Sequence, residues 1–518
     1  MSGSISGRSR WLALLVLCLG VLMIVLDSTI VNVALPSIRI DLGYSETSLV
    51  WVVNAYLLTF GGFLLLGGRL GDLYGHRKLF LFGITLFTLA SLACGLANTQ
   101  EHLIVARAVQ GLGGAVVNAV SLSLIMTLFT EDAERAKAMG VFGFVCAGGG
   151  SIGVLSGGIL TSALNWHWIF LVNIPIGVAV FALCLILLPA GRGQTADRHL
   201  DVAGAVTVTA SLMLAVYAIV NGNEIGWLSI QTIAFLGAAM VLLALFLSIQ
   251  ARVRAPLVPL TLFRLRNVST ANVVGVLWAA ALFAWFFIAA LYLQRVLAYS
   301  ALKVGLAFLP ANLIMAVFSL GLSAKLVMRF GLRLPLATGL VLASIGLALF
   351  ARAPVDGNFA ADVLPGMLLL GFGAGIAFNP LLLAAMSDVE PSQSGLASGV
   401  VNTGFMMGGA LGLAILASGA AAHTNALLAS GADTVSAVNA GYHLAFGVGA
   451  ASAIVAAVVC VAFIRPGKMG SAHESSTAVN TSAGSPPAAS TSAASTSTAS
   501  ASAASTSQST TESAAGSF

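Results

Sequence analysis

The sequence predicts an all-α protein that crosses a membrane many times. Of its 518 residues, 58% are hydrophobic and only 8% are charged, and the mean hydropathy is +0.99. A soluble domain carries about 25% charged residues, so most of this chain is expected to lie in lipid. The formal net charge of +5 does not indicate nucleic-acid binding, because the basic residues are concentrated on one side of the predicted membrane.

Fourteen apolar segments have the length of a membrane-spanning helix, which needs about 20 residues. In chain order, they cover residues 11–33, 48–68, 79–97, 102–127, 138–162, 168–188, 201–220, 230–249, 268–292, 303–325, 334–351, 361–386, 395–418 and 441–464. The connections are mostly short, so neighbouring helices are expected to run antiparallel. The first segment continues past Val25 without a clear small-residue cleavage site, which favours a retained helix over a signal peptide.

The basic residues predict the orientation, because cytoplasmic loops are enriched in lysine and arginine. With the N-terminus in the cytoplasm, 18 of the 23 basic residues fall on the inner side. Four fall on the outer side, Arg39, Arg295, Lys303 and Arg352, and Arg107 remains within a helix. An even number of spans brings both termini to the cytoplasm. The predicted location is the inner or plasma membrane of the cell.

The spans divide the chain into five regions. Residues 1–10 form a cytoplasmic N-terminus, 11–190 a six-helix bundle, 200–250 two additional linking helices, and 268–465 a second six-helix bundle. Residues 470–518 are mostly Ser, Thr and Ala, and such a composition buries too little apolar surface to fold. A disordered cytoplasmic tail is therefore predicted there.

A polar block after the second span indicates an internal repeat. The block Gly68–Lys78 is rich in positive charge and in glycine, as expected of a hairpin loop at the membrane surface. Residues 324–333 follow the second span of the second bundle and align with this block, so that Gly331 matches Gly75. Repeated groups of helices are typical of secondary transporters.

Two glycine triplets occupy equivalent helices of the predicted halves. The fifth helix of the first half carries Gly149, Gly153 and Gly157, and the fifth helix of the second half carries glycines at 404, 408 and 412. Glycines spaced by four form a small face on which another helix packs closely. The pattern is compatible with ordinary helix packing and with a role in gating.

Asp27 and Arg107 are the charged residues that the pattern places deep in the bilayer. Such a charge costs about 2.5–3.5 kcal/mol on insertion scales, which makes each a candidate functional group. Both lie about five or six residues from the outer ends of their helices, hence at similar depth. They are expected to pair, directly or through water, and a carboxylate whose solvation changes during transport can carry a proton. Two simpler interpretations stay open: a solvated Asp27, and an Arg107 bonded only to backbone carbonyls.

Five residues of the polar block form a candidate conformational latch: Gly68, Asp72, Gly75, Arg77 and Lys78. The glycines permit a tight turn, and the carboxylate can cap a nearby helix N-terminus and so favour one conformer. The alternative is an ordinary solvated loop charge.

The chain resembles the 14-helix drug:proton antiporters of the major facilitator superfamily over roughly residues 10–465. The Gly68–Lys78 block resembles the motif found throughout that superfamily. The segments Leu26–Pro36 and Leu103–Gly114 resemble motifs of multidrug exporters, and Trp166–Gly177 is similar to a stretch typical of the 14-helix branch. The resemblance implies two six-helix bundles with two additional membrane-spanning helices.

The resemblance also implies roles for particular residues. In that family an aspartate of helix 1 and an arginine of helix 4, here Asp27 and Arg107, are associated with proton coupling. The antiporter motif GxxxGPxxGG of helix 5 corresponds to residues 149–158, where Val154 replaces the proline that would kink the helix. Its glycine face is kept: Gly149, Gly153, Gly157 and Gly158.

Several residues are candidates for the substrate cavity. Where family members often carry Arg-Gln in helix 13, this chain has Phe405 and Met406, which favours a soft, apolar cavity. The full set of candidates is Asn32, Asn118, Asn402, Phe405 and Met406.

The implied function is proton-driven export of small hydrophobic drugs or toxic metabolites, cationic ones included, by alternating access. No enzymatic activity, metal, cofactor or nucleic-acid partner is expected, and the proton gradient is the expected energy source. Expected partners are the substrates and the lipid bilayer, with an envelope-spanning adaptor protein if the cell is Gram-negative; the protein is expected to be monomeric. Two alternatives stay open: a symporter or facilitator for a specific metabolite, and a non-transporting membrane sensor or scaffold.

Overall fold

The computed structural model describes residues 7–129, 131–188, 200–318, 322–389 and 394–465. The predicted tail lies outside these residues, as do the side chains of several helical residues, Asp72 and Cys146 among them. The described residues are almost entirely helical, and none of them forms a strand. The all-α prediction is confirmed.

The helices of the first half and of the linking region begin and end as follows: α1 (Gly7–Leu42), α2 (Val50–Tyr74), α3 (His76–Gly95), α4 (Gln100–Leu128), α5 (Asp132–Ala163), α6 (Trp168–Leu171), α7 (Asn173–Leu187), α8 (Val202–Ile225) and α9 (Ile230–Arg252). Those of the second half are η1 (Leu260–Arg264), α10 (Arg266–Leu291), η2 (Tyr292–Val296), α11 (Ala301–Val317), α12 (Ser323–Phe330), α13 (Arg333–Phe350), η4 (Phe359–Val363), α14 (Leu364–Met386), α15 (Ser394–Ala429) and α16 (Thr434–Phe463).

Twelve helical segments within the described residues are long and apolar enough to cross a membrane. They coincide with twelve of the predicted spans. The other two predictions, 138–162 and 303–325, correspond to the 32-residue α5 and to α11 followed by α12. The helices therefore agree in outline with the fourteen-span prediction.

The segment Gly68–Lys78, predicted as a hairpin loop at the membrane surface, is mostly helical, which corrects that prediction. α2 continues to Tyr74 and α3 begins at His76, so Gly75 alone separates them. Gly75 has a φ of 94°, a conformation that glycine adopts without steric cost, and one such residue suffices to end a helix. Gly331, its aligned counterpart, has a φ of 74° at the end of α12.

The repeat is evident from which helices pack against one another. In the first half α1 packs against α5 and α7, and α4 packs against α2 and α3. In the second half α10 packs against α15 and α16, and α14 packs against α11 and α13. Between the halves, α5 packs against α11 and α2 against α15, so the inter-half pairs are also related by the repeat.

The glycine triplets lie where the fifth helix of each half meets the first. A Cβ added at Gly153 would lie 2.9 Å from the carbonyl oxygen of Leu26 in α1. A Cβ at Gly408 would lie 2.8 Å from the Cα of Val276 in α10. These positions bring the two backbones of each pair too close for a larger side chain. Gly158 instead faces α11, where its Cβ would lie 2.8 Å from the carbonyl oxygen of Ala301.

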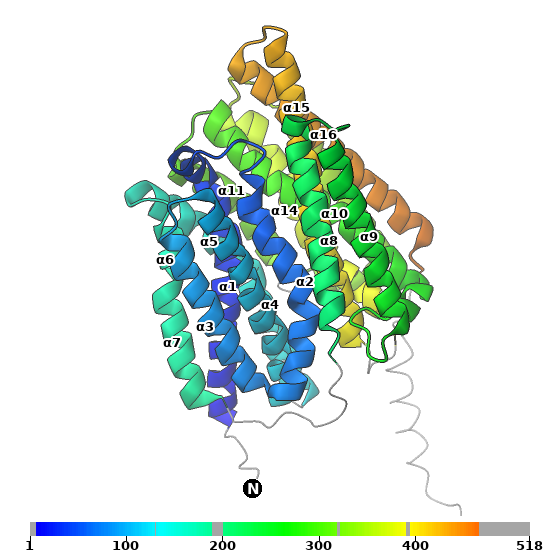
Figure 1. Ribbon diagram of the computed structural model, residues 1–518. Coiled ribbons are helices and arrows are strands. Elements are labelled where there is room, and N and C mark those ends of the chain that lie inside the picture. Colours follow the sequence, from blue (N-terminus) through cyan, green and yellow to red (C-terminus); the bar gives the residue numbers. More distant parts are fainter. Residues whose placement is uncertain (1–6, 130, 189–199, 319–321, 390–393, 466–518) are drawn as a thin grey trace, which may run out of the picture. The chain divides into compact units, whose positions relative to one another are not determined.

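The two linking helices lie side by side along the seam between the halves (Figure 1). α8 packs against both α2 and α15, and α9 packs against α8. The Asn223 Nδ2 of α8 donates to the Ser418 carbonyl of α15 over 2.7 Å, and the Ser418 hydroxyl donates to the Ile219 carbonyl over 3.0 Å. α8 is thus bonded to the second half while it packs on the first.

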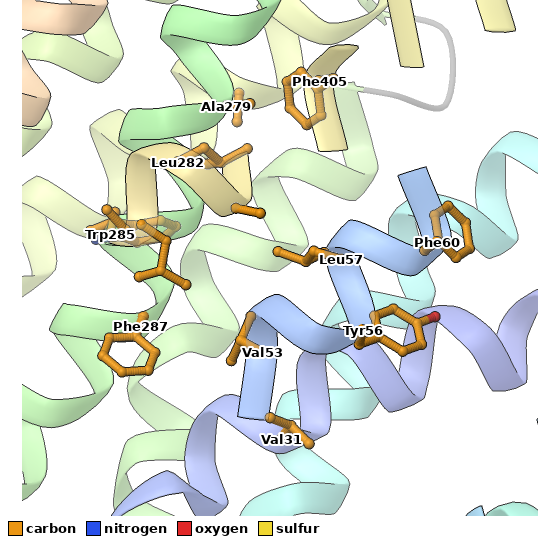
Figure 2. Close-up of a cluster of buried hydrophobic side chains, with 14 of the residues drawn as sticks. Val31, Val53, Tyr56, Leu57, Phe60, Ala279, Leu282, Trp285, Phe287 and Phe405 are labelled. Carbon is orange, nitrogen blue, oxygen red and sulfur yellow. The ribbon is translucent and has the colours of Figure 1, made fainter. Parts of the chain in front are cut away.

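A continuous apolar core joins the two halves (Figure 2). On α2, Val53, Leu57 and Phe60 lie on one face, at spacings of four and three residues. Figure 2 shows these side chains next to others from both halves: Val31, Tyr56, Ala279, Leu282, Trp285, Phe287 and Phe405. The core between the two halves is therefore built mainly from aromatic and aliphatic side chains.

Candidate functional site

Asp27 is a fully buried carboxylate in the middle of α1. Its Oδ2 accepts from the Arg107 guanidinium over 2.6 Å. Its Oδ1 accepts from Gln110 Nε2 over 2.7 Å and from Asn173 Nδ2 over 2.9 Å. Three donors from two other helices therefore compensate for the lost hydration of the charge.

Arg107 reaches Asp27 from α4 and is itself 1% exposed. Its Nε donates to the Val52 carbonyl of α2 over 2.9 Å, and its NH1 also donates to Gln110 Oε1 over 2.6 Å. The Tyr56 ring of α2 lies 4.3 Å from the guanidinium carbon, a cation–π contact. The guanidinium thus binds both the carboxylate and a backbone carbonyl, and the two residues that the sequence placed at similar depth are in direct contact.

Gln110, Asn173 and Ser91 complete this network, and the sequence reasoning did not single them out. Gln110 lies one helical turn after Arg107, and Asn173 lies within the stretch typical of the 14-helix branch. The Ser91 hydroxyl of α3 accepts from Gln110 Nε2 over 2.7 Å and lies 3.4 Å from Asn173 Nδ2. The spacing of Gln110 from Arg107 could have pointed to Gln110 in the sequence. Asn173 and Ser91 come near Asp27 only through tertiary packing.

The latch residues are spread along the junction of α2 and α3. Arg77 donates to the Leu185 carbonyl near the end of α7 over 2.6 Å, a favourable position for a cation. Gly68 lies within the last turns of α2, Gly75 forms the junction, and Lys78 is exposed. The side chain of Asp72 lies outside the described part of the chain, so its role stays a prediction.

A second residue of the same block, Arg69, contacts the linker that leads into the second half. It donates to the carbonyls of Ala255 and Pro256 over 3.3 and 2.8 Å. The next residues of the linker are held by buried Asp201 and Gln250, which accept from the backbone N–H groups of 257 and 258. Asp201 also accepts from Gly204 N over 2.7 Å, so it caps the N-terminus of α8.

Polar contacts between the halves lie on the side predicted to be outside. The Gln294 amide donates to the Val33 carbonyl over 2.9 Å, and Asn54 donates to the Ala410 carbonyl over 2.9 Å. Two further contacts join Leu302 N to Ser162 Oγ over 3.1 Å and Arg295 to Glu46 as an ion pair. These contacts hold the outer ends of the two halves together in this conformation.

The cavity candidates do not form one cluster. Phe405 is buried and makes aromatic contacts with Phe283 and Phe378, whose ring centroids lie 5.9 and 5.7 Å away. Met406 packs against Gly61 of α2, at the seam between the halves. Asn32 donates only weakly to its own helix, at 3.4 Å from the carbonyl oxygens of residues 28 and 29, and Asn118 and Asn402 are half-buried. Phe405 is the candidate that Figure 2 labels within the apolar cluster.

α5 is one continuous helix through the antiporter-motif region. Val154, which stands where the family carries proline, is 1% exposed, and its carbonyl oxygen lies 2.9 Å from the place of a Cβ at Gly305 of α11. With no proline ring in this segment, no backbone hydrogen bond needs to be lost there. The glycine face thus lies on an uninterrupted helix.

Comparison with known proteins places this chain in a family. The family model described as Major Facilitator Superfamily matches residues 17–413, a stretch that includes Asp27, Arg107 and both glycine triplets. The chain belongs to the major facilitator superfamily. It is a multi-pass membrane transporter of that superfamily and not an enzyme.

Several relatives in the superfamily are named for drug resistance or export. The puromycin resistance protein pur8 of Streptomyces alboniger is 40% identical over 450 residues, 85% of this chain and 89% of that protein. The cephamycin export protein CmcT of Amycolatopsis lactamdurans is 38% identical over 407 residues, 78% and 84% of the two chains. The multidrug resistance protein Stp of Mycobacterium tuberculosis is 36% identical over 421 residues, 81% and 78% of the two chains.

A solved structure of the superfamily fold supports the architecture. The nucleoside transporter NupG aligns with a TM-score of 0.59 at 12% identity, over 88% of this chain and 100% of that chain. At this identity the likeness concerns the fold alone. It supports the helical transporter fold of the described residues.

Proposed function

We propose that this transporter exports small, largely hydrophobic compounds from the cytoplasm in exchange for protons. The observation that carries the proposal is the buried network of Asp27, Arg107, Gln110 and Asn173. Export of drugs is supported by the names of the relatives, which refer to puromycin, cephamycin, lincomycin, tetracenomycin C and multidrug resistance. Proton coupling rests on the chemistry of the network.

A purely structural role accounts poorly for this network. Replacing a buried ion pair by apolar residues of similar volume is often neutral or stabilising, so the pair is a weak source of stability. Ionisable residues in membrane-spanning helices are costly and mark ion pathways or proton relays. Asp27 can take up a proton when Arg107 moves away and release it when the guanidinium returns, because the cation stabilises only the ionised form.

The apolar core of Figure 2 favours hydrophobic substrates. Aromatic side chains such as Phe405 offer large contact areas to ring-containing compounds without demanding one hydrogen-bond pattern. An ionised Asp27 in the same half as Tyr56 and Phe60 also suits a cationic compound once the central helices separate.

We further propose that the protein lies in the inner or plasma membrane with both termini in the cytoplasm. It acts as a monomer, and the proton gradient is its only energy source.

The latch residues Gly68, Asp72, Gly75, Arg77 and Lys78 would then lie at the cytoplasmic surface. An Asp72→Asn variant is expected to insert normally, because the substitution keeps the size of the side chain. It is expected to transport more slowly, because the latch loses the charge of its carboxylate. Equal turnover at every pH would remove the latch from the proposal.

The test is drug accumulation in inverted membrane vesicles. Vesicles that contain the wild-type protein and have an acidic interior should concentrate puromycin or lincomycin, and a proton ionophore should abolish this. A facilitator would equilibrate the drug without a gradient, a symporter would show the opposite dependence on the gradient, and a sensor or scaffold would move none. Any of these three results would contradict the proposal.

A further inference from the structure

The carboxylate of Asp27 is surrounded by groups that donate hydrogen bonds. Arg107 donates to Oδ2, and Gln110 and Asn173 both donate to Oδ1. All three arrangements suit an ionised carboxylate, which only accepts. A proton carrier must also be stable in its neutral form, in which the carboxylic acid carries one O–H donor that needs an acceptor. The neutral form therefore requires a neighbour that can accept.

Two of the three neighbours cannot accept in this arrangement. A guanidinium has no acceptor atom. The oxygen of Gln110 is already used, because Oε1 accepts from Arg107 NH1 over 2.6 Å and lies 3.7 Å from the Cys94 thiol. Reversing the Gln110 amide would point its NH₂ group at the guanidinium, so that two donors would face each other.

Asn173 has the freedom that the other two lack. It is the first residue of α7, next to Val172, the one residue between α6 and α7. It is 1% exposed, and its amide lies between Asp27 Oδ1 at 2.9 Å and Ser91 Oγ at 3.4 Å. Rotation about its last side-chain torsion exchanges the amide nitrogen and oxygen without moving the backbone. The Ser91 hydroxyl satisfies either orientation, because it both donates and accepts.

We propose that Asn173 is a positioning residue that holds Asp27 in both protonation states, donating to the carboxylate through its N–H and, after rotation, accepting the O–H of the carboxylic acid through its oxygen. The inference rests on the proposed proton antiport. The proton is bound on Oδ1 of Asp27 and leaves from the same atom, and no covalent bond of Asn173 changes. The other charged or titratable groups that face this carboxyl are Arg107 of α4, Tyr56 of α2 and Cys94 of α3.

The sharpest test compares two variants of equal shape, Asn173→Thr and Asn173→Val, which differ by one hydroxyl that can donate and accept. Asn173→Leu, close in shape to asparagine, is the second apolar variant. Asn439→Leu is the matched control, because Asn439 is also buried but donates to the Ala353 carbonyl in the other half. Each protein is placed in inverted vesicles and assayed with puromycin or lincomycin, whichever the wild type accumulates.

Two activities are measured for each variant: accumulation driven by an acidic interior, and exchange of labelled for unlabelled drug without a gradient. Exchange needs drug binding and conformational change but no proton cycle. We expect Asn173→Val and Asn173→Leu to lose about tenfold or more of the gradient-driven accumulation, as for a buried hydrogen bond left unmade, while exchange stays near wild type. Asn173→Thr should recover most of the loss, and Asn439→Leu should keep the wild-type ratio of the two activities.

The inference is overturned if Asn173→Val accumulates drug as well as Asn173→Thr, or if every Asn173 variant loses exchange in proportion to accumulation. The Asp27→Asn variant in the same vesicles separates this result from a failure of proton antiport itself. If Asp27→Asn accumulates drug fully, the proposed function fails. If Asp27→Asn is inactive while the Asn173 variants match wild type, only the role of Asn173 is wrong.

Discussion

Three helices bring the buried network together at one depth. α1 supplies Asp27, α4 supplies Arg107 and Gln110, and α7 supplies Asn173. Gln110 follows Arg107 by three positions in α4, so the two side chains share a face of that helix. Asn173 reaches the same point because α7 begins there. The network is therefore fixed by helix register, and single substitutions within it have distinct expected effects.

Asp27→Asn removes the buried carboxyl and keeps its volume. We expect normal or better membrane insertion, because an insertion cost is relieved, and retained binding of neutral drugs. The variant should lose gradient-driven export and should no longer protect growing cells against the exported drug. Full gradient-driven export by this variant would contradict the assignment of Asp27 as the proton carrier.

Arg107→Ala leaves the Asp27 charge without its cation. Removing one partner of a buried pair typically costs about 3–5 kcal/mol, so a lower unfolding temperature in detergent is expected together with impaired export. The double variant Asp27→Asn/Arg107→Ala should export no worse than either single variant, because both act on the same step. Additive losses in the double variant would indicate two independent sites.

The helices show how much of the architecture follows from the sequence. The all-α class, the approximate spans and the aligned turns at Gly75 and Gly331 follow from apolar length and from glycine placement, both of which are local properties. The hairpin loop at Gly68–Lys78 was wrongly expected, because polar residues at the membrane surface can continue a helix in water. Asn173 could not be predicted, because a polar residue in an apolar helix gains its partner only through tertiary packing.

At the level of helix pairs, the close approach of α10 and α15 has a direct test. Gly412 faces Ala280 of α10, whereas Gly419 of the same helix faces open space. Gly412→Ala should force the two helices apart and cost about 1–3 kcal/mol of stability, as overpacking does. Thermal unfolding in detergent measures this, and Gly419→Ala is the control, expected to be neutral or slightly stabilising. Equal unfolding temperatures for the two variants would refute the close packing.

At the scale of the whole molecule, transport by alternating access requires the two halves to move against each other. The ends predicted to lie outside are joined through Arg295 and Glu46 and through hydrogen bonds such as that of Gln294 with the Val33 carbonyl. The linking helix α8 contacts both halves, so it has to follow the movement. The bundle boundaries predicted at 11–190 and 268–465 stay predictions, as do the monomeric state and, for a Gram-negative cell, the envelope-spanning adaptor protein.

The orientation itself is tested with reporters fused after Lys468. The bias of 18 basic residues to 4 predicts a cytoplasmic C-terminus, so a reporter active only in the cytoplasm should be active and one active only outside should be silent. Removing the residues beyond Gly470 should leave export intact, because that segment is predicted to be disordered. The reverse reporter pattern would invert every assignment of inner and outer side.

Proton movement caused by the drug tests the central claim most directly. Inverted vesicles with an acidic interior and a pH-sensitive dye inside are mixed with a transported drug, with wild type and Asp27→Asn compared at equal protein density. The account predicts that drug entry raises the internal pH in wild-type vesicles and leaves it unchanged in Asp27→Asn vesicles. Drug entry into wild-type vesicles without any change of internal pH would contradict it.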